Sequence, residues 1–239
     1  MSGNSSTPTQ HLSQWLAAFD AALQRADVAA VMAMFDDDSY WRDMLTFTWN
    51  IKTQEGKEQI EAMLRATLGH VKPSHWQAEG EATEAGGVTE AWVTFETAQA
   101  NGRAHIRLKG DKCWTLLTTM VSLKGHEEPK ADKRPRGVDH GVFRDRKNWA
   151  ELKAQREAAL GYTEQPYCVI VGGGQGGIGL GARLRRLGVP TIIVEKNKRP
   201  GDSWRNRYKS LALHDPVWYD HMPYLPFPAN YPVYIPRDK

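Results

Sequence analysis

The amino-acid sequence predicts an α+β unit followed by the start of a parallel α/β unit. Apolar residues recur at helical spacing up to about residue 70, and strand-like segments follow as far as Leu123. Near Tyr167 the pattern changes to a continuous apolar run, a glycine-rich turn and another helical segment. With 239 residues, the chain has room for one large domain or two small ones.

The composition is that of an ordinary globular protein. Hydrophobic residues make up 41% and charged residues 25%, which argues against a disordered or collagen-like chain. The net charge of +3 is too small to indicate a nucleic-acid partner. Cys113 and Cys168 lie far apart and outside any C-x-x-C, so we expect no disulfide scaffold, no metal site and a reducing compartment.

The first ten residues lack the basic and apolar parts of a targeting signal, and we predict a disordered leader over residues 1–10. No apolar run approaches the roughly 18 residues that a membrane span needs. We therefore expect a cytoplasmic protein with no membrane segment in this chain.

Three helices are expected in the first part of the chain. The first carries an apolar stripe from Leu12 to Leu23. Asp27 is a good N-cap for the second, whose inner face is expected to reach Phe35, and Gly56 opens the third. The remaining inward-facing residues are Trp15, Leu16, Phe19, Val28, Val31, Met32, Ile60, Met63, Leu64 and Leu68.

An antiparallel meander is expected after about His75. Residues 91–98 and 103–108 flank Asn101-Gly102, so they are predicted to pair as a hairpin around that turn. Residues 113–123 form the next strand. The other turn signals are Gly86-Gly87 and Gly110-Asp111. Residues 11–123 thus form one α+β domain.

Residues 124–165 are predicted to be a charged linker with one short helix. Residues 124–166 contain ten Lys/Arg and eight Asp/Glu, and Trp149 to Leu160 has helical spacing. We interpret the segment as a solvated connector, with binding of an acidic partner as the alternative.

A glycine motif marks the start of a dinucleotide-binding unit. Residues 167–171 and 191–194 are apolar enough for buried parallel strands, and a helical segment that ends at Gly188 lies between them. The turn after the first strand has the pattern G-x-G-x-x-G, in which the glycines allow a tight turn, approach of a pyrophosphate and close helix packing. The candidate pyrophosphate-binding residues are Gly172, Gly174, Gln175, Gly176 and Gly177.

An acidic residue follows the second strand at the expected distance. Glu195 lies 18 residues after Gly177, against a usual offset of about 20. Its carboxylate would accept hydrogen bonds from the adenosine ribose and repel a 2′-phosphate, so the site suits FAD or NAD rather than NADP. The alternative is a glycine-rich turn beside a surface glutamate.

The segment after Glu195 resembles the flavin-containing monooxygenases, and within them the YUCCA-like branch. The resemblance covers residues 167–239, about a third of the chain. It rests on an ordered set of features after the motif, which are Glu195, Lys196, Gly201, Trp204, Arg205, Tyr208, Leu211, Leu213 and Pro226-Phe227-Pro228.

The resemblance implies FAD and NADPH as cofactors and molecular oxygen and a small organic substrate as partners. In that family NADPH reduces the flavin, and a C4a-hydroperoxyflavin transfers one oxygen atom to the substrate. The resemblance also implies that Lys196 lies beside the adenine and that Ser203, Trp204 and Arg205 lie near the flavin. His214 would contact the flavin or the nicotinamide. No catalytic residue is assigned. Trp204 could instead belong to the core, and His214 to a loop.

The chain departs from that family in lacking a second G-x-G-x-x-G for NADPH. Residues 166–239 are too few for a complete six-stranded Rossmann-type sheet. We therefore expect an incomplete α/β Rossmann-type FAD-binding domain, in the N-terminal part of a longer protein that is inactive alone.

The first domain resembles the NTF2-like (SnoaL-like) α+β cone fold in its layout and in the segment FDDDSYWRD. Such cones serve as small enzymes, ligand pockets or homodimer modules. An Asp–His pair could act in acid–base chemistry, or these residues could be ordinary core and surface positions. The candidate pocket residues are Trp41, Arg42, Asp43, Trp49, His105 and Trp114.

Two other functions remain open at this point. The chain could be a non-catalytic NTF2-like ligand-binding or dimerisation module with a remnant nucleotide-binding tail. Glu195 also permits an NAD-linked dehydrogenase, although the segment from Trp204 to Pro228 argues against it.

Overall fold

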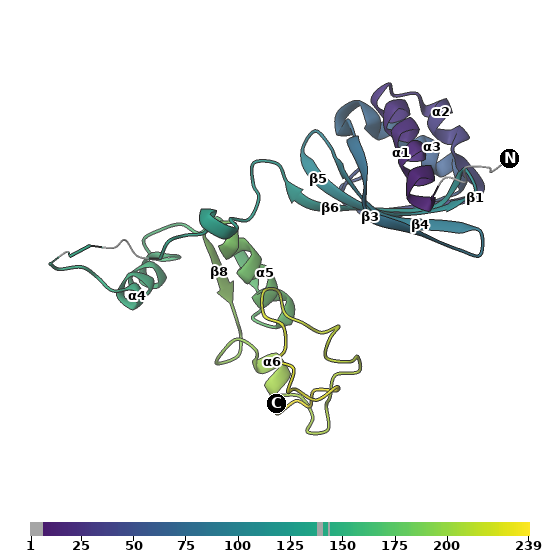
Figure 1. Ribbon diagram of the computed structural model, residues 1–239. Coiled ribbons are helices and arrows are strands. Elements are labelled where there is room, and N and C mark those ends of the chain that lie inside the picture. Colours follow the sequence, from purple (N-terminus) through teal and green to yellow (C-terminus); the bar gives the residue numbers. More distant parts are fainter. Residues whose placement is uncertain (1–6, 138–140, 143) are drawn as a thin grey trace. The chain divides into compact units, whose positions relative to one another are not determined.

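The computed structural model describes residues 7–137, 141–142 and 144–239, and the chain divides into two compact units at Glu127/Glu128 (Figure 1). The first unit contains a six-stranded sheet of order β2-β1-β6-β5-β4-β3, and three helices cover one of its faces. Its elements are α1 (Pro8–Gln24), α2 (Val28–Ala33), β1 (Phe35–Met44), β2 (Ile51–Glu55), α3 (Gly56–Val71), β3 (Ser74–Ala85), β4 (Val88–Glu96), β5 (Ala100–Lys109) and β6 (Lys112–Leu123).

Helix α1 begins earlier than predicted. Thr7 is its N-cap and forms a capping box with Gln10, and Pro8 occupies the first turn, where its missing N–H costs nothing. The helix therefore includes residues 8–10, which we expected in a disordered leader. Residues 1–6 of that predicted leader lie outside the described residues. The predicted apolar stripe from Leu12 to Leu23 is confirmed as buried.

The second helix is shorter than predicted. Asp27 caps it as expected, because its side chain accepts a hydrogen bond from the Ala30 N–H at 3.0 Å. The helix ends at Ala33, and Phe35 is the first residue of β1 rather than part of the helix. The predictions missed both β1 and β2, which lie between α2 and α3.

The sheet is mixed rather than a purely antiparallel meander. β1 pairs parallel with β6, with Asp43 opposite Thr118, and the other strand pairs are antiparallel. Parallel pairing needs a long connection between the strands, and α3 together with β3–β5 provides it.

The predicted hairpin between β4 and β5 is confirmed, but its turn is displaced. Asn101 and Gly102 lie within β5, opposite Glu96 and Phe95, and the turn consists of residues 97–99. Thr97 stabilises this turn by accepting a hydrogen bond from the Ala100 N–H at 2.9 Å. A Cβ on Gly102 would lie 2.4 Å from the Phe95 ring, so glycine is required there for packing and not for a turn.

Aromatic side chains fill the space between the helices and the sheet. Phe35 stacks on Trp41 with ring centroids 5.8 Å apart, and Trp76 stacks on Phe95 at 4.2 Å. Phe19 of α1 packs edge-on against Trp76 at 5.1 Å and so joins the helices to the sheet. This packed core occupies the interior that the alternative with a ligand pocket would require to be open.

The second unit has less regular structure. It contains a 3₁₀ turn (Ala131–Lys133), α4 (Trp149–Ala159), β7 (Cys168–Val171), α5 (Gln175–Arg186), β8 (Thr191–Val194) and α6 (Asp202–Arg205). The predicted linker helix is α4, and the predicted strand–helix–strand segment is β7–α5–β8. Asn148 caps α4 through a capping box with Glu151, but no side chain of this helix is buried.

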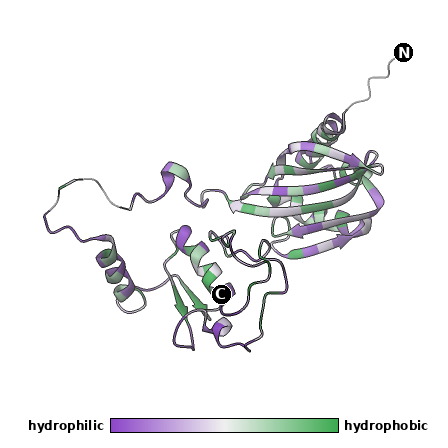
Figure 2. Ribbon diagram, turned by 60° about the horizontal axis from the view of Figure 1, so that its bottom comes forward, coloured by the Kyte–Doolittle hydropathy of each residue, from purple (hydrophilic) through white to green (hydrophobic). Residues whose placement is uncertain are grey.

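Strands β7 and β8 pair in parallel, as the sequence predicted, with Val171 opposite Val194. Their predicted burial on both faces is not observed, since Val169 is 52% exposed and Val171 90% exposed. Figure 2 shows the two strands as short green arrows, which marks them as hydrophobic. Only Ile170 of β7 is buried, because α5 covers one face of the pair.

The start of the predicted solvated linker is packed against α5. Arg183 of α5 donates to Glu128 at 2.8 Å, and Tyr224 donates to the same carboxylate. Arg186 donates to the Pro129 carbonyl at 2.8 Å. Glu128 and Pro129 are therefore part of the second unit. Predicted linker residues 138–140 and 143 lie outside the described residues.

The last part of the chain folds back on itself with little regular structure. The Leu213 N–H donates to the Ile235 carbonyl at 2.9 Å, and the Val217 N–H donates to the Val233 carbonyl at 2.7 Å. Leu211 and Ile235 are buried. Across the described ranges, no helix has the length and apolar character needed to cross a membrane.

Candidate functional site

The turn between β7 and α5 requires glycine at its first position. Gly172 has φ of +106°, a conformation that side-chain-bearing residues rarely adopt, and its N–H donates to the Val194 carbonyl of β8 at 2.8 Å. This bond ties the turn to the end of the second strand. The first glycine of the motif thus has the tight-turn role predicted from the sequence.

The third glycine of the motif permits very close packing. A Cβ on Gly177 would lie 1.9 Å from the carbonyl oxygen of Gly172 and 3.3 Å from the Ile170 side chain. Any side chain here would push α5 away from the turn and the strand. Close helix–strand packing at Gly177 therefore agrees with the prediction.

The N-terminus of α5 is open to an anion. Gly174 is its N-cap and makes no side-chain capping bond, so the N–H groups of Gln175, Gly176 and Gly177 lie in the first turn without intrahelical acceptors. A Cβ on Gly174 would lie 3.1 Å from the Ser203 hydroxyl. The absence of a side chain there keeps the helix end accessible, and uncapped N–H groups with the positive end of the helix dipole suit phosphate.

Glu195 lies directly beside the glycine turn. The Gly173 N–H donates to Glu195 Oε2 at 2.5 Å, while the backbone N–H and side-chain amide of Asn197 donate to Oε1 at 2.8 and 2.6 Å. The hydrogen bonds from Asn197 and Gly173 hold the pKa of the Glu195 carboxyl below its ordinary value. The carboxylate is therefore ionised at neutral pH and can accept hydrogen bonds from hydroxyl groups.

The other predicted cofactor residues have mixed placements. Ser203 is near Gly174, and Lys196, next to Glu195, is exposed. Trp204 is half-buried, and its Nε1 donates to the Arg237 carbonyl at 3.2 Å, which anchors the C-terminal segment. His214 is exposed in a bend that follows the bridge between Ala212 and Pro236. Nothing in this geometry brings His214 to the glycine turn.

Arg205 makes structural hydrogen bonds rather than lining an open site. Its guanidinium donates to Asp202 at 2.8 Å and to the Pro200 carbonyl at 2.9 Å. Arg199 donates to the same carboxylate at 3.1 Å. Asp202 was not singled out from the sequence, and only its position between two arginines i−3 and i+3 could have indicated this role.

The acid–base pair considered for the first unit does not form. Asp43 is completely buried, whereas His105 lies on the outer face of the sheet, with its ring centroid 4.8 Å from that of Trp92. The strand register explains the separation, because Asp43 pairs with the core-facing Thr118 and His105 with its neighbour Leu117. Burial lowers the pKa of His105, so this side chain favours its neutral form.

Asp43 organises the loop that follows β1. It accepts five hydrogen bonds, from the N–H groups of Thr46, Phe47 and Thr48 and from the hydroxyls of Thr48 and Thr118. The Thr118 hydroxyl also accepts from the Trp41 indole at 2.9 Å. All of these polar groups have hydrogen-bond partners within the protein, as a structural role requires.

The remaining pocket candidates do not converge either. Arg42 is exposed and donates to Thr53 at 3.2 Å, while Trp49 is 55% exposed in the loop before β2. Trp114 is half-buried with the Lys109 ammonium 3.9 Å from its ring centroid. These residues do not line a shared pocket, so the interpretation as ordinary core and surface positions describes them better.

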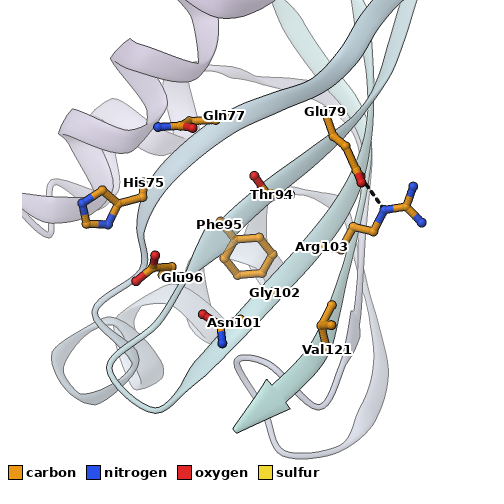
Figure 3. A pocket seen from close by; sticks show the side chains of 10 residues that line it. All are labelled: His75, Gln77, Glu79, Thr94, Phe95, Glu96, Asn101, Gly102, Arg103 and Val121. Atoms are coloured by element: carbon orange, nitrogen blue, oxygen red, sulfur yellow. Dashed lines mark hydrogen bonds and ion pairs between the residues drawn. The ribbon is translucent and has the colours of Figure 1, made fainter. Parts of the chain in front are cut away.

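A different hollow lies on the outer face of the sheet, with a volume of 390 Å³ (Figure 3). Its floor includes Gly102, and Glu79 and Arg103 form an ion pair at its edge at 2.6 Å. Glu96, also in its lining, pairs with Lys124 at 2.8 Å. These charged groups already neutralise one another, so the hollow offers no strong attraction to a charged ligand.

Comparison with curated proteins finds relatives over about a third of the chain. No family model matches the chain. It is 41% identical over 78 residues to the indole-3-pyruvate monooxygenase YUCCA1 of Oryza sativa subsp. japonica, covering 32% of this chain and 19% of the relative. It is 37% identical over 68 residues to an uncharacterized CzcO-like oxidoreductase of Geobacillus kaustophilus, covering 27% and 20%.

Part of this chain is YUCCA-like. The probable indole-3-pyruvate monooxygenase YUCCA4 of Arabidopsis thaliana is also 39% identical, over 70 residues. The chain spans a fifth or less of the length of these curated relatives.

Solved structures similar to this chain include NTF2-like proteins. An NTF2-like protein of Cytophaga hutchinsonii has a TM-score of 0.34 and 11% identity, covering 50% of this chain and 95% of that one. A ketosteroid isomerase-like protein of Erwinia carotovora atroseptica has a TM-score of 0.41 and 13% identity, covering 50% and 99%.

Proposed function

We propose that the second unit begins an FAD-binding domain, and that the protein to which it belongs is an FAD- and NADPH-dependent monooxygenase. The observation that carries this proposal is the turn from Gly172 to Gly177, which leaves no room for a side chain at Gly177 and lies against the carboxylate of Glu195. The identity of about 40% to YUCCA monooxygenases supports the same assignment.

The residues present fit the adenosine diphosphate part of FAD. The uncapped helix end at Gly174 would hold the pyrophosphate through the N–H groups of Gln175, Gly176 and Gly177. Glu195 would accept from the ribose, and Lys196 would lie beside the adenine. A carboxylate at this position disfavours a 2′-phosphate, so the fit is to FAD rather than NADP.

The flavin end of the cofactor would lie toward Ser203 and Trp204. Ser203 is near Gly174, and Trp204 holds the Arg237 carbonyl, so together they border the turn on its α6 side. Arg205 would act indirectly, by fixing Asp202 and the Gly201 turn. When bound, FAD would accept a hydride from NADPH and then transfer oxygen from O₂ to a small organic substrate. The NADPH site is proposed to lie outside this chain.

The first unit is proposed to be an NTF2-like cone domain with a packed interior. Its three helices on one face of a six-stranded sheet carry this assignment. Complete burial of Trp41 and Phe47 argues against an interior ligand pocket. Homodimerisation through this unit, and a cytoplasmic location, stay proposals.

Flavin binding by this chain tests the assignment. We expect FAD to bind weakly, with quenching of its fluorescence, and E195A to weaken the affinity about tenfold through loss of a charged hydrogen-bond acceptor. Glu164→Ala, a change at an exposed glutamate of the same unit, is the matched control and should bind like wild type. FAD affinity equal in wild type and E195A would contradict the assignment of the site.

Monooxygenase activity is tested on the protein that carries this sequence, purified from its source organism. We expect bound flavin and NADPH oxidation accompanied by O₂ uptake. A protein that retains no flavin and uses NAD as its hydride acceptor would support the dehydrogenase alternative instead.

A further inference from the structure

Asn197 has no role in the predictions drawn from the sequence, yet its side chain points at the proposed ribose-binding carboxylate. It is the third residue after β8, and its amide Nδ2 donates to Glu195 Oε1 at 2.6 Å. Its own backbone N–H donates to the same oxygen at 2.8 Å. Asn197 therefore contacts Glu195 twice, both times at one oxygen atom.

The second carboxylate oxygen is held from the other side. The Gly173 N–H donates to Glu195 Oε2 at 2.5 Å, and the Gly201 N–H donates to the Gly173 carbonyl at 2.7 Å. A side chain on Gly173 would crowd this contact, since a Cβ there would lie 3.0 Å from Oε2. The residue that donates to Oε2 is thus itself held, through its carbonyl, by the loop before α6.

These contacts leave one acceptor position open. A carboxylate has two lone pairs on each oxygen, about four acceptor positions in all. Asn197 uses both positions of Oε1, and Gly173 uses one position of Oε2. The remaining lone pair of Oε2 is available to a ligand, and its direction is fixed because the carboxylate cannot rotate without breaking these bonds.

We infer that Asn197 is a positioning residue that fixes the Glu195 carboxylate so that its Oε2 accepts one hydroxyl group of an adenosine ribose. Without the Asn197 side chain, a partly exposed glutamate would have to lose rotational freedom when the nucleotide binds, which weakens selective recognition. This inference rests on the proposed function of the glycine turn, and it adds which residue gives Glu195 its selectivity.

The test compares ADP with its two deoxy analogues, because ADP contains the ribose and pyrophosphate of FAD without the flavin. Binding of ADP, 2′-deoxy-ADP and 3′-deoxy-ADP is measured by calorimetry on wild type, N197A, E195Q and the double variant. In wild type, we expect the analogue that lacks the recognised hydroxyl to bind about tenfold more weakly than ADP, since a hydrogen bond to a charged group is lost. The other analogue should bind like ADP.

In N197A we expect this tenfold preference to fall below about threefold, as it should in E195Q, and the double variant should match E195Q because both changes act on the same contact. Asn230→Ala, a change at an exposed asparagine of the same unit, should keep the full preference. Circular dichroism verifies folding, and N197D, which has the same shape but cannot donate when ionised, replaces N197A if that variant does not fold.

The outcomes separate the two proposals. A tenfold preference retained in N197A, or equal weakening of all three nucleotides, overturns the positioning role, because a purely structural residue would not change the selectivity. A wild-type chain that binds neither ADP nor FAD overturns the proposed function of the turn.

Discussion

Trp41 in β1 has no exposed surface, whereas Val171 in β7 leaves 90% of its surface exposed. Both lie in strands of parallel pairs, but β1 belongs to a six-stranded sheet under three helices and β7 to a two-stranded sheet with α5 on one face. A strand is buried only when other layers cover it, whatever its own composition. Apolar composition alone therefore does not determine how deeply a strand is buried in either unit.

The second unit is nevertheless tightly packed at one place. Gly177 and Gly172 approach so closely that a single added carbon would overlap with the backbone. The first unit is held by apolar burial, and the turn of the second by backbone hydrogen bonds and glycine. Substitutions that remove a core contact and those that fill a glycine position should thus affect different units.

The largest effect is expected at Asp43. D43A leaves three buried or half-buried N–H groups and the Thr118 hydroxyl without their acceptor, so we expect a loss of about 4 kcal/mol in the free energy of unfolding. Urea unfolding followed by tryptophan fluorescence measures it. Asp38→Ala, at an exposed position of the same strand, should cost less than about 1 kcal/mol. A similar small loss for D43A would contradict the structural role.

A loss of about 3 kcal/mol is expected for G177A, because its Cβ would lie 1.9 Å from the Gly172 oxygen and force α5 outward. The neighbouring change G176A has open space and replaces a helical glycine, so it should stabilise the unit by about 0.5–1 kcal/mol. Thermal unfolding by circular dichroism compares the two. Equal stabilities would mean that the turn does not hold the helix as closely as described.

A matched pair of valines tests the contrast between the units directly. V93A, in the fully buried part of β4, should cost about 2 kcal/mol, because it leaves a cavity in the core. V171A should change the free energy of unfolding by less than about 0.5 kcal/mol, since the side chain already contacts water. A large loss at Val171 measured by urea unfolding would show that another surface covers β7 in solution.

The smallest effect concerns pH. Hydrogen bonds from Asn197 and Gly173 lower the pKa of Glu195, so the carboxylate contributes to ligand binding above that lowered pKa and loses the contribution as pH falls through it. We expect the affinity for FAD, whose pyrophosphate does not titrate in this range, to stay close to its pH 7 value at pH 4.5, the ordinary pKa of glutamate. A halved affinity at pH 4.5 in calorimetric titrations would indicate an unshifted carboxyl.

The β7–α5–β8 segment could be predicted well because its rules are local. The G-x-G-x-x-G spacing imposes a turn, a helix start and a close approach within six residues. Even the unusual φ of Gly172 follows from that pattern. The contacts of Asn197, Asp202 and Arg205 could not be predicted, since they depend on how the following loop returns to the turn.

Strand β1 was missed for a physical reason. Three consecutive aspartates, at positions 36–38, disfavour a strand, and the inward-facing Ser39 and Asp43 interrupt the expected alternation of apolar residues. Asp43 is tolerated inside only because Thr118, 75 residues later in the chain, donates to it. Local sequence patterns cannot reveal a hydrogen-bond partner so far away in the chain.

The turn of the β4–β5 hairpin was predicted at the wrong position because Asn-Gly occurs in two structural contexts. It commonly forms a two-residue turn, but here Gly102 makes space for the Phe95 ring on the facing strand. The roles of Trp41 and His105 were likewise open in the sequence, since an aromatic or histidine in a strand can face either side of the sheet.

Helix α4 of the second unit is held by fewer contacts than the other long helices. Its 11 residues have a capping box at the start but bury no side chain, and isolated helices shorter than about 12–15 residues are only marginally stable in water. Its amide hydrogens should therefore exchange with solvent far sooner than those of α1 or α5. A protease should also cut first within or beside α4, so brief digestion would release the sheet unit intact.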